Sequence, residues 1–180
     1  DVCSLCNGRA TLKHILNMCP TALSQGRLTY RHNSVLRYMV NELKDKAESN
    51  DIQMSLYADL SGFRVGGGTV PPNVMPTTEK PDIVMHFANG NEQRVVLIEL
   101  TVSFEPNIRK ARERKEERYQ QLLGDIKAKH IESHLVCFEI GSRGVVTNEN
   151  KQQVNQIFKY VGVNACKNIV NKLSRLALVG

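Results

Sequence analysis

The chain has 180 residues, a formal net charge of +6, and 41% hydrophobic and 23% charged residues, which is the composition of an ordinary globular domain. Its length allows one domain and a small appendage, and no apolar run approaches the ~18 residues of a membrane-spanning helix, so we expect no membrane partner. With no tryptophan and 6% aromatic residues, the chain also lacks the composition of an aromatic platform for single-stranded nucleic acid.

The N-terminal segment carries the spacing Cys3-x2-Cys6-x7-His14-x4-Cys19. Three thiolates and one imidazole are a known ligand set for a closed, tetrahedral zinc site. A segment this short cannot bury a core of its own, so metal binding would supply its folding free energy. We therefore predict a zinc module with a structural role at residues 1–24. The alternative is that these cysteines are scattered packing residues.

The chain contains five cysteines and begins with Asp1-Val2-Cys3, which is neither an initiating methionine nor a signal peptide. Cysteines without a signal peptide indicate a reducing compartment. Cys137 and Cys166 lie in apolar segments, where we expect buried packing residues. The first residues also lead us to expect that the chain is a piece of a longer protein.

Helices and strands are predicted from the periodicity of the apolar residues. The expected elements are a helix at 29–49, a strand at 52–60, a loop at 61–79, a hairpin at 80–102, a helix from Pro106 to about Lys129, a strand at 133–140, and helices at 148–160 and 164–177. This order predicts an α/β fold in which a mixed sheet is flanked by helices.

The hairpin brings two acidic residues together. Its turn signal is Asn89-Gly90-Asn91, between two apolar runs. If the turn is Gly90-Asn91, Asp82 faces Glu99 directly, and a turn one residue earlier makes the two diagonal neighbours, so either register places the carboxylates within about 5–8 Å. Like charges that close need a proton or a cation between them, and Mg²⁺ prefers such oxygen ligands. The alternatives are an incidental turn aspartate and an exposed glutamate on an edge strand.

A lysine interrupts the apolar stripe of the helix that follows the hairpin. Lys115 falls in the gap between Ala111 and Tyr119, on the face that the apolar residues predict to be buried. A lysine facing a core is costly unless its charge has a partner. The carboxylate pair would be such a partner, and the alternative is that Lys115 extends along the helix edge to solvent.

Basic residues are concentrated in two stretches. Residues 109–118 contain six Lys and Arg against three Glu, and residues 151–180 contain five Lys and Arg and no acid. Beside a carboxylate pair, this charge indicates a polyanion such as nucleic acid, although solvated helix faces are the simpler alternative. We expect the following side chains to neutralise backbone phosphates: Arg109, Lys110, Arg112 and Arg114.

These motifs occur in the order found in one family. Lys80-Pro81-Asp82 followed about sixteen residues later by Glu99-Leu100-Thr101 resembles the restriction-like endonuclease of site-specific non-LTR retrotransposons, a variant of the PD-(D/E)XK nucleases. That family also has the Cys/His knuckle upstream, an Arg-His-Asn motif, here Arg31-His32-Asn33, and a Lys-x-x-Lys-Tyr stretch, here residues 115–119. The chain departs from the wider pattern where Thr101 replaces the usual lysine, which the resemblance displaces to position 115, and where arginine replaces the second lysine of the stretch.

The resemblance implies a restriction-endonuclease-like fold for residues 25–180 after a CCHC zinc knuckle at residues 1–24. It implies a metal-dependent DNA endonuclease in which Asp82, Glu99 and the Leu100 carbonyl hold catalytic Mg²⁺ or Mn²⁺, and Lys115 orients water or balances charge. Cleavage would leave a 3′-hydroxyl that primes a linked reverse transcriptase, N-terminal in the same polypeptide. The implied partner is double-stranded DNA, with element RNA left open, and the implied location is the nucleus.

The side chains expected to contact nucleic acid are Arg31, His32, Asn33, Lys80, Arg109, Lys110, Arg112, Arg114, Arg118 and Tyr119. For residues 31–33, contact with the zinc module and a plain helix start with solvated neighbours are also open. Two other functions remain as alternatives. One is a catalytically inactive zinc-knuckle module that only binds nucleic acid, and the other is a junction-resolving nuclease on the same fold, which would require a symmetric dimer.

Overall fold

The computed structural model describes residues 1–165 and 167–178. Its elements are the π-helix η1 (His14–Met18), α1 (Pro20–Ser24), α2 (Arg27–Ser49), β1 (Ser55–Ala58), β2 (Ile83–Asn89), β3 (Glu92–Ser103), the 3₁₀-helix η2 (Glu105–Asn107), α3 (Ile108–Ala128), β4 (Glu132–Gly141), α4 (Asn148–Lys159) and α5 (Lys167–Leu176). None of the helices in this part of the chain combines the length and the apolar content needed to cross a bilayer.

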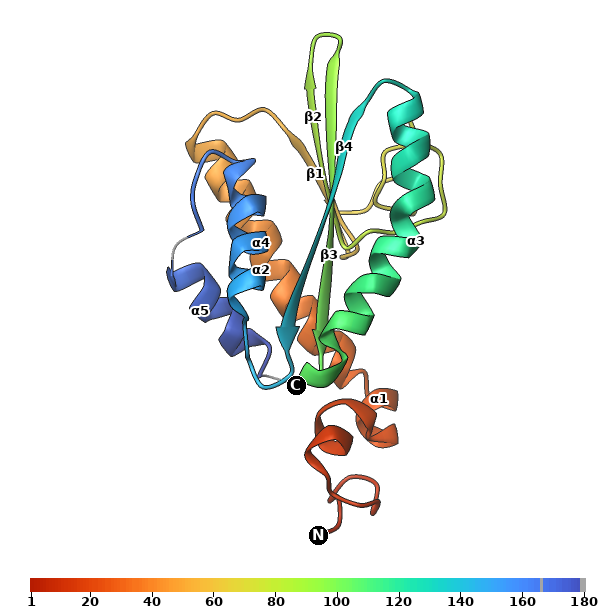
Figure 1. Ribbon diagram of the computed structural model, residues 1–180, viewed down its shortest axis with the longest axis vertical. Helices are drawn as coiled ribbons and strands as arrows, with labels where there is room; N and C mark the ends of the chain where they lie inside the picture. The colour runs from red at the N-terminus through yellow and green to blue at the C-terminus, as the bar shows by residue number, and fades with distance from the viewer. Residues whose placement is uncertain (166, 179–180) are drawn as a thin grey trace.

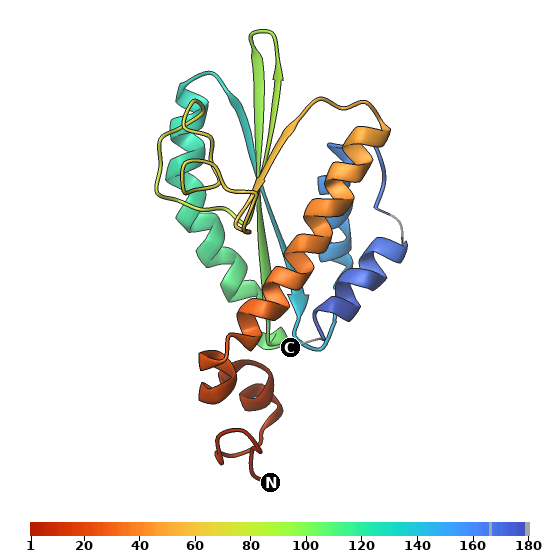
Figure 2. The same cartoon turned by 180° about the vertical axis from the view of Figure 1, so that it is seen from behind.

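The four strands form one mixed sheet in the order β1-β2-β3-β4. The first two pairings are antiparallel, and β3 and β4 are parallel, with α3 as the crossover between them. Figures 1 and 2 show α3 on one face of the sheet and α2, α4 and α5 on the other. The expected α/β fold with a mixed sheet flanked by helices is therefore confirmed.

Two hydrophobic cores lie on opposite faces of the sheet. On one face, Met39 of α2 and Phe158 of α4 pack against Ile98 and other residues of the sheet. On the other face, Tyr119 and Ile126 of α3 pack against the intervening strand residues, whose side chains point the opposite way. Strand β3 is central, and residues 95–98 are fully buried, as a strand covered on both faces requires. This packing places α3 directly against β3.

The hairpin turn is Gly90-Asn91, because Asn89 pairs with Glu92. Gly90 has a φ of 58°, a left-handed conformation that glycine adopts without a Cβ penalty. The register pairs Ile83 with Ile98, and one further step along it sets Asp82 opposite Glu99.

Two elements differ from the expected boundaries. Strand β1 covers only Ser55–Ala58, because Ile52 still donates its backbone N–H to Ala47 at the end of α2. Helix α3 begins at Ile108, since Pro106 belongs to the preceding 3₁₀ turn. Cys137 is buried as expected, while the prediction for Cys166 lies outside the described residues.

The N-terminal module projects from the end of the sheet at which β3 finishes, and it joins the domain through α2 (Figure 1). Cys3, Cys19 and Ala22 form a small core of their own, separate from the two cores of the sheet. Arg31 of α2 is 5% exposed and donates from Nη1 to the Leu16 carbonyl at 3.0 Å. This hydrogen bond fastens the module to the first turns of α2.

Candidate functional site

Asp82 and Glu99 lie side by side at the point where β2 begins. They are 9% and 3% exposed. The Asp82 backbone N–H donates to Glu99 Oε1 at 3.3 Å, and the Leu100 N–H donates to Asp82 Oδ2 at 2.8 Å. Each carboxylate is thus fixed by the backbone of the strand that carries the other, and the hairpin itself builds the pair.

Lys115 reaches this pair from α3. Its Nζ donates to Glu99 Oε2, to the Leu100 carbonyl at 2.7 Å, and to Asp82 Oδ2 at 3.4 Å. Because two carboxylates and one carbonyl converge on a single ammonium group, this cation offsets the repulsion between the buried acids. The lysine in the apolar stripe of α3 is therefore an inward-facing residue with a partner.

The surroundings of the two acids shift their pKa values in opposite directions. Burial raises the pKa of Asp82, but the hydrogen bond and charge of His32, with Lys115, outweigh it and lower that pKa to about 2. Burial, together with the negative charge of Asp82, raises the pKa of Glu99 to about 7 despite Lys115. For Lys115, burial lowers the pKa, and the charges of the two carboxylates reverse this and raise it. The arrangement favours one firmly ionised acid and a charged lysine.

His32 contributes a contact to Asp82 that the sequence did not predict. Its Nε2 lies 3.3 Å from Asp82 Oδ1, and its Nδ1 lies 3.2 Å from Asn33 Oδ1. Burial lowers the pKa of His32, but the hydrogen bond and charge of Asp82 outweigh it and raise the pKa. His32 therefore holds one oxygen of Asp82 and leaves the other directed at Lys115.

We expect His32→Ala to raise the pKa of the Asp82 carboxyl, because the hydrogen bond and charge of His32 are the largest contributions that lower it. The measurement is an NMR titration that follows the carboxyl carbon of Asp82 in each variant and in the wild-type protein. His134→Ala is the matched control, since His134 lies at the surface, pairs with Glu132 and contacts the ring of Tyr160, far from Asp82 in the sheet. Superimposable titrations for the two variants would contradict this role.

Several side chains expected to contact nucleic acid have protein partners instead. Arg112 faces inward and pairs with Glu139 and Glu149, and its Nη2 donates to Asn150 at 3.0 Å. Arg31 is buried against the module, as described above. These two guanidinium groups are engaged within the protein in this structure, so neither is free for a phosphate.

Of the other side chains expected to contact nucleic acid, the basic ones described next lie at the surface, while Tyr119 is buried. Arg118 pairs with Glu79 at 2.7 Å and lies over the ring of Tyr119, while Arg109 pairs with Glu113 at 2.9 Å. The ring of Tyr119 is buried beside Glu99, and burial together with the charge of Glu99 raises its pKa. Within the described residues, the following exposed cations of the set form no ion pair: Lys80, Lys110 and Arg114.

An open groove begins at Thr101, two residues along β3 from Glu99. It has a volume of about 770 Å³ and runs between the end of β3 and the first half of α3. Thr101 and Ser103 line it from the strand, and Lys110 and Arg114 line it from the helix, beside Glu113 and Glu117. The hydroxyl oxygens of Thr101 and Ser103 are themselves buried and have no hydrogen-bond partner among the described residues.

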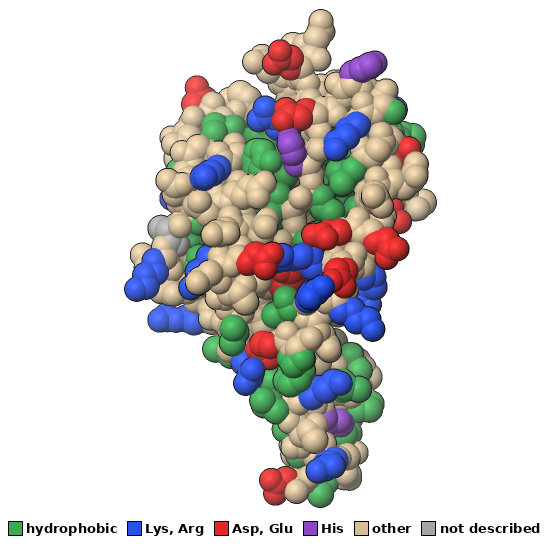
Figure 3. Space-filling model, viewed as in Figure 1, with side chains coloured by type: hydrophobic (Ala, Val, Ile, Leu, Met, Phe, Trp, Pro, Cys, Tyr) green, Lys and Arg blue, Asp and Glu red, His purple; other side chains and the backbone are tan. Residues whose placement is uncertain are grey.

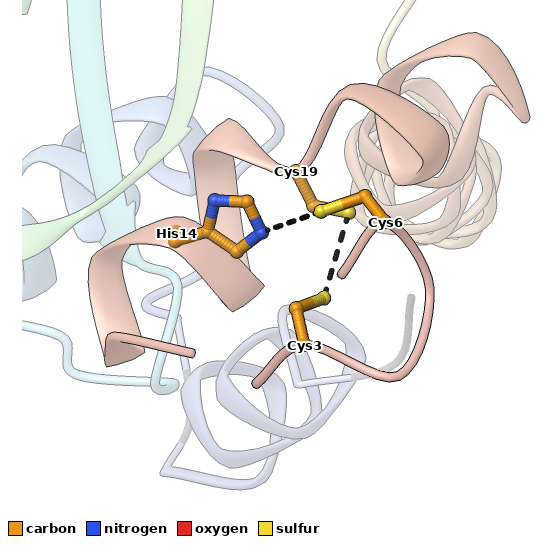
Figure 4. A group of neighbouring side chains, drawn as sticks. All are labelled: Cys3, Cys6, His14 and Cys19. Carbon is orange, nitrogen blue, oxygen red and sulfur yellow. Dashed lines mark hydrogen bonds between the residues drawn. The ribbon is translucent and has the colours of Figure 1, made fainter. Parts of the chain in front are cut away.

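The second cluster is the Cys/His group of the N-terminal module (Figure 4). The ligand atoms of Cys3, Cys6, His14 and Cys19 all lie within 4.8 Å of one another, and the two sulfur atoms of Cys3 and Cys19 are 3.9 Å apart. A tetrahedral zinc ion with Zn–S bonds of about 2.3 Å requires sulfur separations of roughly 3.8 Å. The backbone N–H groups of Leu5 and Cys6 lower the pKa of Cys3 to about 6, which favours the thiolate that zinc binds. The cluster can therefore hold a zinc ion.

Removing one zinc ligand should unfold the module and leave the sheet domain intact, because the cores of the two parts are separate. If wild-type protein carries zinc in native mass spectrometry, we expect Cys19→Ala to carry none and to expose residues 1–24 to protease. Cys137→Ala is the control, since Cys137 is a buried cysteine outside the cluster. Zinc retained in Cys19→Ala would show that this cysteine is not a ligand.

Neither a protein-family model nor a curated protein matches this chain.

Proposed function

We propose that the chain is a metal-dependent DNA endonuclease whose sheet is a version of the restriction-endonuclease fold. The observation that carries the proposal is the convergence of Asp82 Oδ2, Glu99 Oε2 and the Leu100 carbonyl on one cation, Lys115 Nζ. Burying two carboxylates and a lysine together costs desolvation free energy, which apolar residues in the same place would not cost. A purely structural role therefore does not explain them. Carboxyl groups whose pKa values are shifted in opposite directions, as those of Asp82 and Glu99 are, occur often at functional sites.

The donor set fits a hard divalent cation. Two carboxylates and one backbone carbonyl, all oxygen, are ligands that Mg²⁺ and Mn²⁺ accept, together with oxygens of water and phosphate. A bound Mg²⁺ or Mn²⁺ would lower the pKa of an attacking water and polarise the scissile phosphate. Asp82, Glu99 and Leu100 are the residues that would hold it.

The other side chains have separate tasks in this proposal. Lys115, on a flexible four-carbon stem, would leave the carboxylates when a metal binds and pair with the attacking water or with a phosphate oxygen. His32 would keep Asp82 in its ligand orientation. The groove beside β3 would receive the DNA strand, with Lys110 and Arg114 against its phosphates.

The finer assignment is also a proposal. The order of the knuckle, the Arg-His-Asn motif, the paired acids and the displaced lysine supports a restriction-like endonuclease of a site-specific non-LTR retrotransposon. On that assignment the enzyme nicks double-stranded DNA in the nucleus and leaves a 3′-hydroxyl for a linked reverse transcriptase. The zinc module would have a structural role.

The test is nicking of supercoiled plasmid DNA. The wild-type protein is expected to produce relaxed circles with Mg²⁺ or Mn²⁺ and none when EDTA is added, and the nicks should prime a DNA polymerase because they carry a 3′-hydroxyl. Lys115→Met should slow nicking, while Lys127→Met, an exposed lysine on the same helix, should not. DNA binding that persists while no divalent ion yields nicks would refute the enzyme and favour an inactive binding module.

A further inference from the structure

The outward face of α5 carries positively charged side chains that pair with no acid among the described residues. The exposed residues of this helix are Lys167, Asn168, Asn171, Lys172 and Arg175. At 100° per residue they fall within one arc of about 140°, opposite the buried residues Ile169 and Leu173. The face therefore consists of cations and side-chain amides.

This charge differs from that of the other helices. On α3, four basic residues pair with acids, among them Arg109 with Glu113 and Arg118 with Glu79. By contrast, Lys167, Lys172 and Arg175 form no ion pair with any described residue. The chain has no Asp or Glu after Glu149. In Figure 3, Lys and Arg side chains gather over the edge of the molecule where α5 lies.

We propose that this face, residues 167–175 of α5, is a second surface for double-stranded DNA. The choice of DNA as the partner rests on the proposed function. Lys167 and Arg175 are roughly 12 Å apart along the helix axis, which spans about three nucleotides of one strand at ~3.4 Å each. Charge complementarity thus fits the three cations to successive backbone phosphates, and Asn168 and Asn171 add neutral donors.

The composition of the face distinguishes between kinds of nucleic acid. It contains no aromatic side chain on which an unpaired base could stack, which favours a duplex over a single strand. It also lies on the sheet face opposite α3 and its groove. DNA bound there extends the contact of the protein away from the site of cleavage, so the face contributes to affinity and not to the chemical step.

The test compares a triple variant, Lys167→Gln/Lys172→Gln/Arg175→Gln, with a control of equal charge change, Lys44→Gln/Lys46→Gln/Lys127→Gln. Both are made in the Asp82→Asn background, so that the DNA stays uncut, and anisotropy of a labelled duplex is measured between 50 and 200 mM salt. Loss of three phosphate contacts should reduce the slope of log K against log salt by about 2.7. Over this range the wild-type affinity should therefore fall about 40-fold more than that of the α5 variant.

Three results would overturn the inference. The first is that the α5 variant and the control give the same binding curves, and the second is that the α5 variant loses affinity for an RNA duplex but not for a DNA duplex. The third is a lowered melting temperature of the α5 variant, which would trace its weaker binding to misfolding. With Asp82 restored, saturating DNA should give the α5 variant an unchanged kcat and a raised KM. If the protein never nicks DNA but the α5 variant still weakens binding, the proposed enzyme fails and this surface stands.

Discussion

The Asp82→Asn variant is expected to nick supercoiled DNA at least roughly 10³-fold more slowly than the wild-type protein, because the change removes a charge aimed at the transition state while leaving the shape of the side chain. Asp82 is ionised at neutral pH, since its pKa is about 2. An asparagine oxygen can still accept the Leu100 N–H, so the hairpin should stay folded.

The assay for Asp82→Asn is the initial rate of relaxed-circle formation with Mg²⁺, beside a melting curve of each protein. Asp125→Asn is the control, because Asp125 is an exposed aspartate on α3 that accepts a hydrogen bond from Gln121. Equal rates for Asp82→Asn and wild type would remove the proposed site. If Asp82→Asn is inactive because it is unfolded, Glu99→Gln tests the second carboxylate of the site instead.

Arg112→Met should lower the free energy of unfolding by about 3 kcal/mol or more, because it leaves a buried carboxylate without its cation. Glu139 is 1% exposed and pairs with Arg112, whose guanidinium also contacts Glu149 and Asn150. For a chain of this size, the loss corresponds to a fall in melting temperature of roughly 6–12 °C. Thermal or urea unfolding followed by circular dichroism measures it.

Arg109→Met is the matched control for Arg112→Met, since both remove an arginine of α3 but Arg109 is 92% exposed in its pair with Glu113. The control should change stability by no more than about 0.5 kcal/mol. Replacing both buried partners, as Arg112→Met/Glu139→Leu, should recover most of the lost stability. An Arg112→Met variant as stable as the control would show that the buried Glu139 does not depend on this cation.

The elements, the sheet class and the pairing of the acids could be predicted because their signals are local. The Asn-Gly turn sets the register of β2 and β3, and the register alone places Asp82 opposite Glu99. Lys115 could be placed because helical periodicity shows which residues share a buried face. The spacing of Cys3, Cys6, His14 and Cys19 likewise anticipated the cluster that the structure assembles.

The contacts that escaped prediction depend on packing between elements far apart in sequence. The sequence does not show that α2 crosses the sheet so that His32 reaches Asp82, fifty residues later. Arg112 was expected among phosphate-binding residues because its neighbours are basic, but Glu139 lies on β4, which only the parallel pairing brings beneath α3. Strand β1 is shorter than its alternating pattern predicts, because Ile52, at the start of that pattern, is hydrogen-bonded to the end of α2.

The order of the elements along the chain affects the order in which the hairpin and α3 can fold. The two acids are joined by a tight turn and can meet through a local loop closure, whereas Lys115 reaches them only when α3 docks as part of the crossover between β3 and β4. A folding route in which the hairpin pairs first therefore confines two negative charges before their counterion arrives. On that route the docking of α3 gains an electrostatic driving force, and folding should slow at low ionic strength when Lys115 is neutralised.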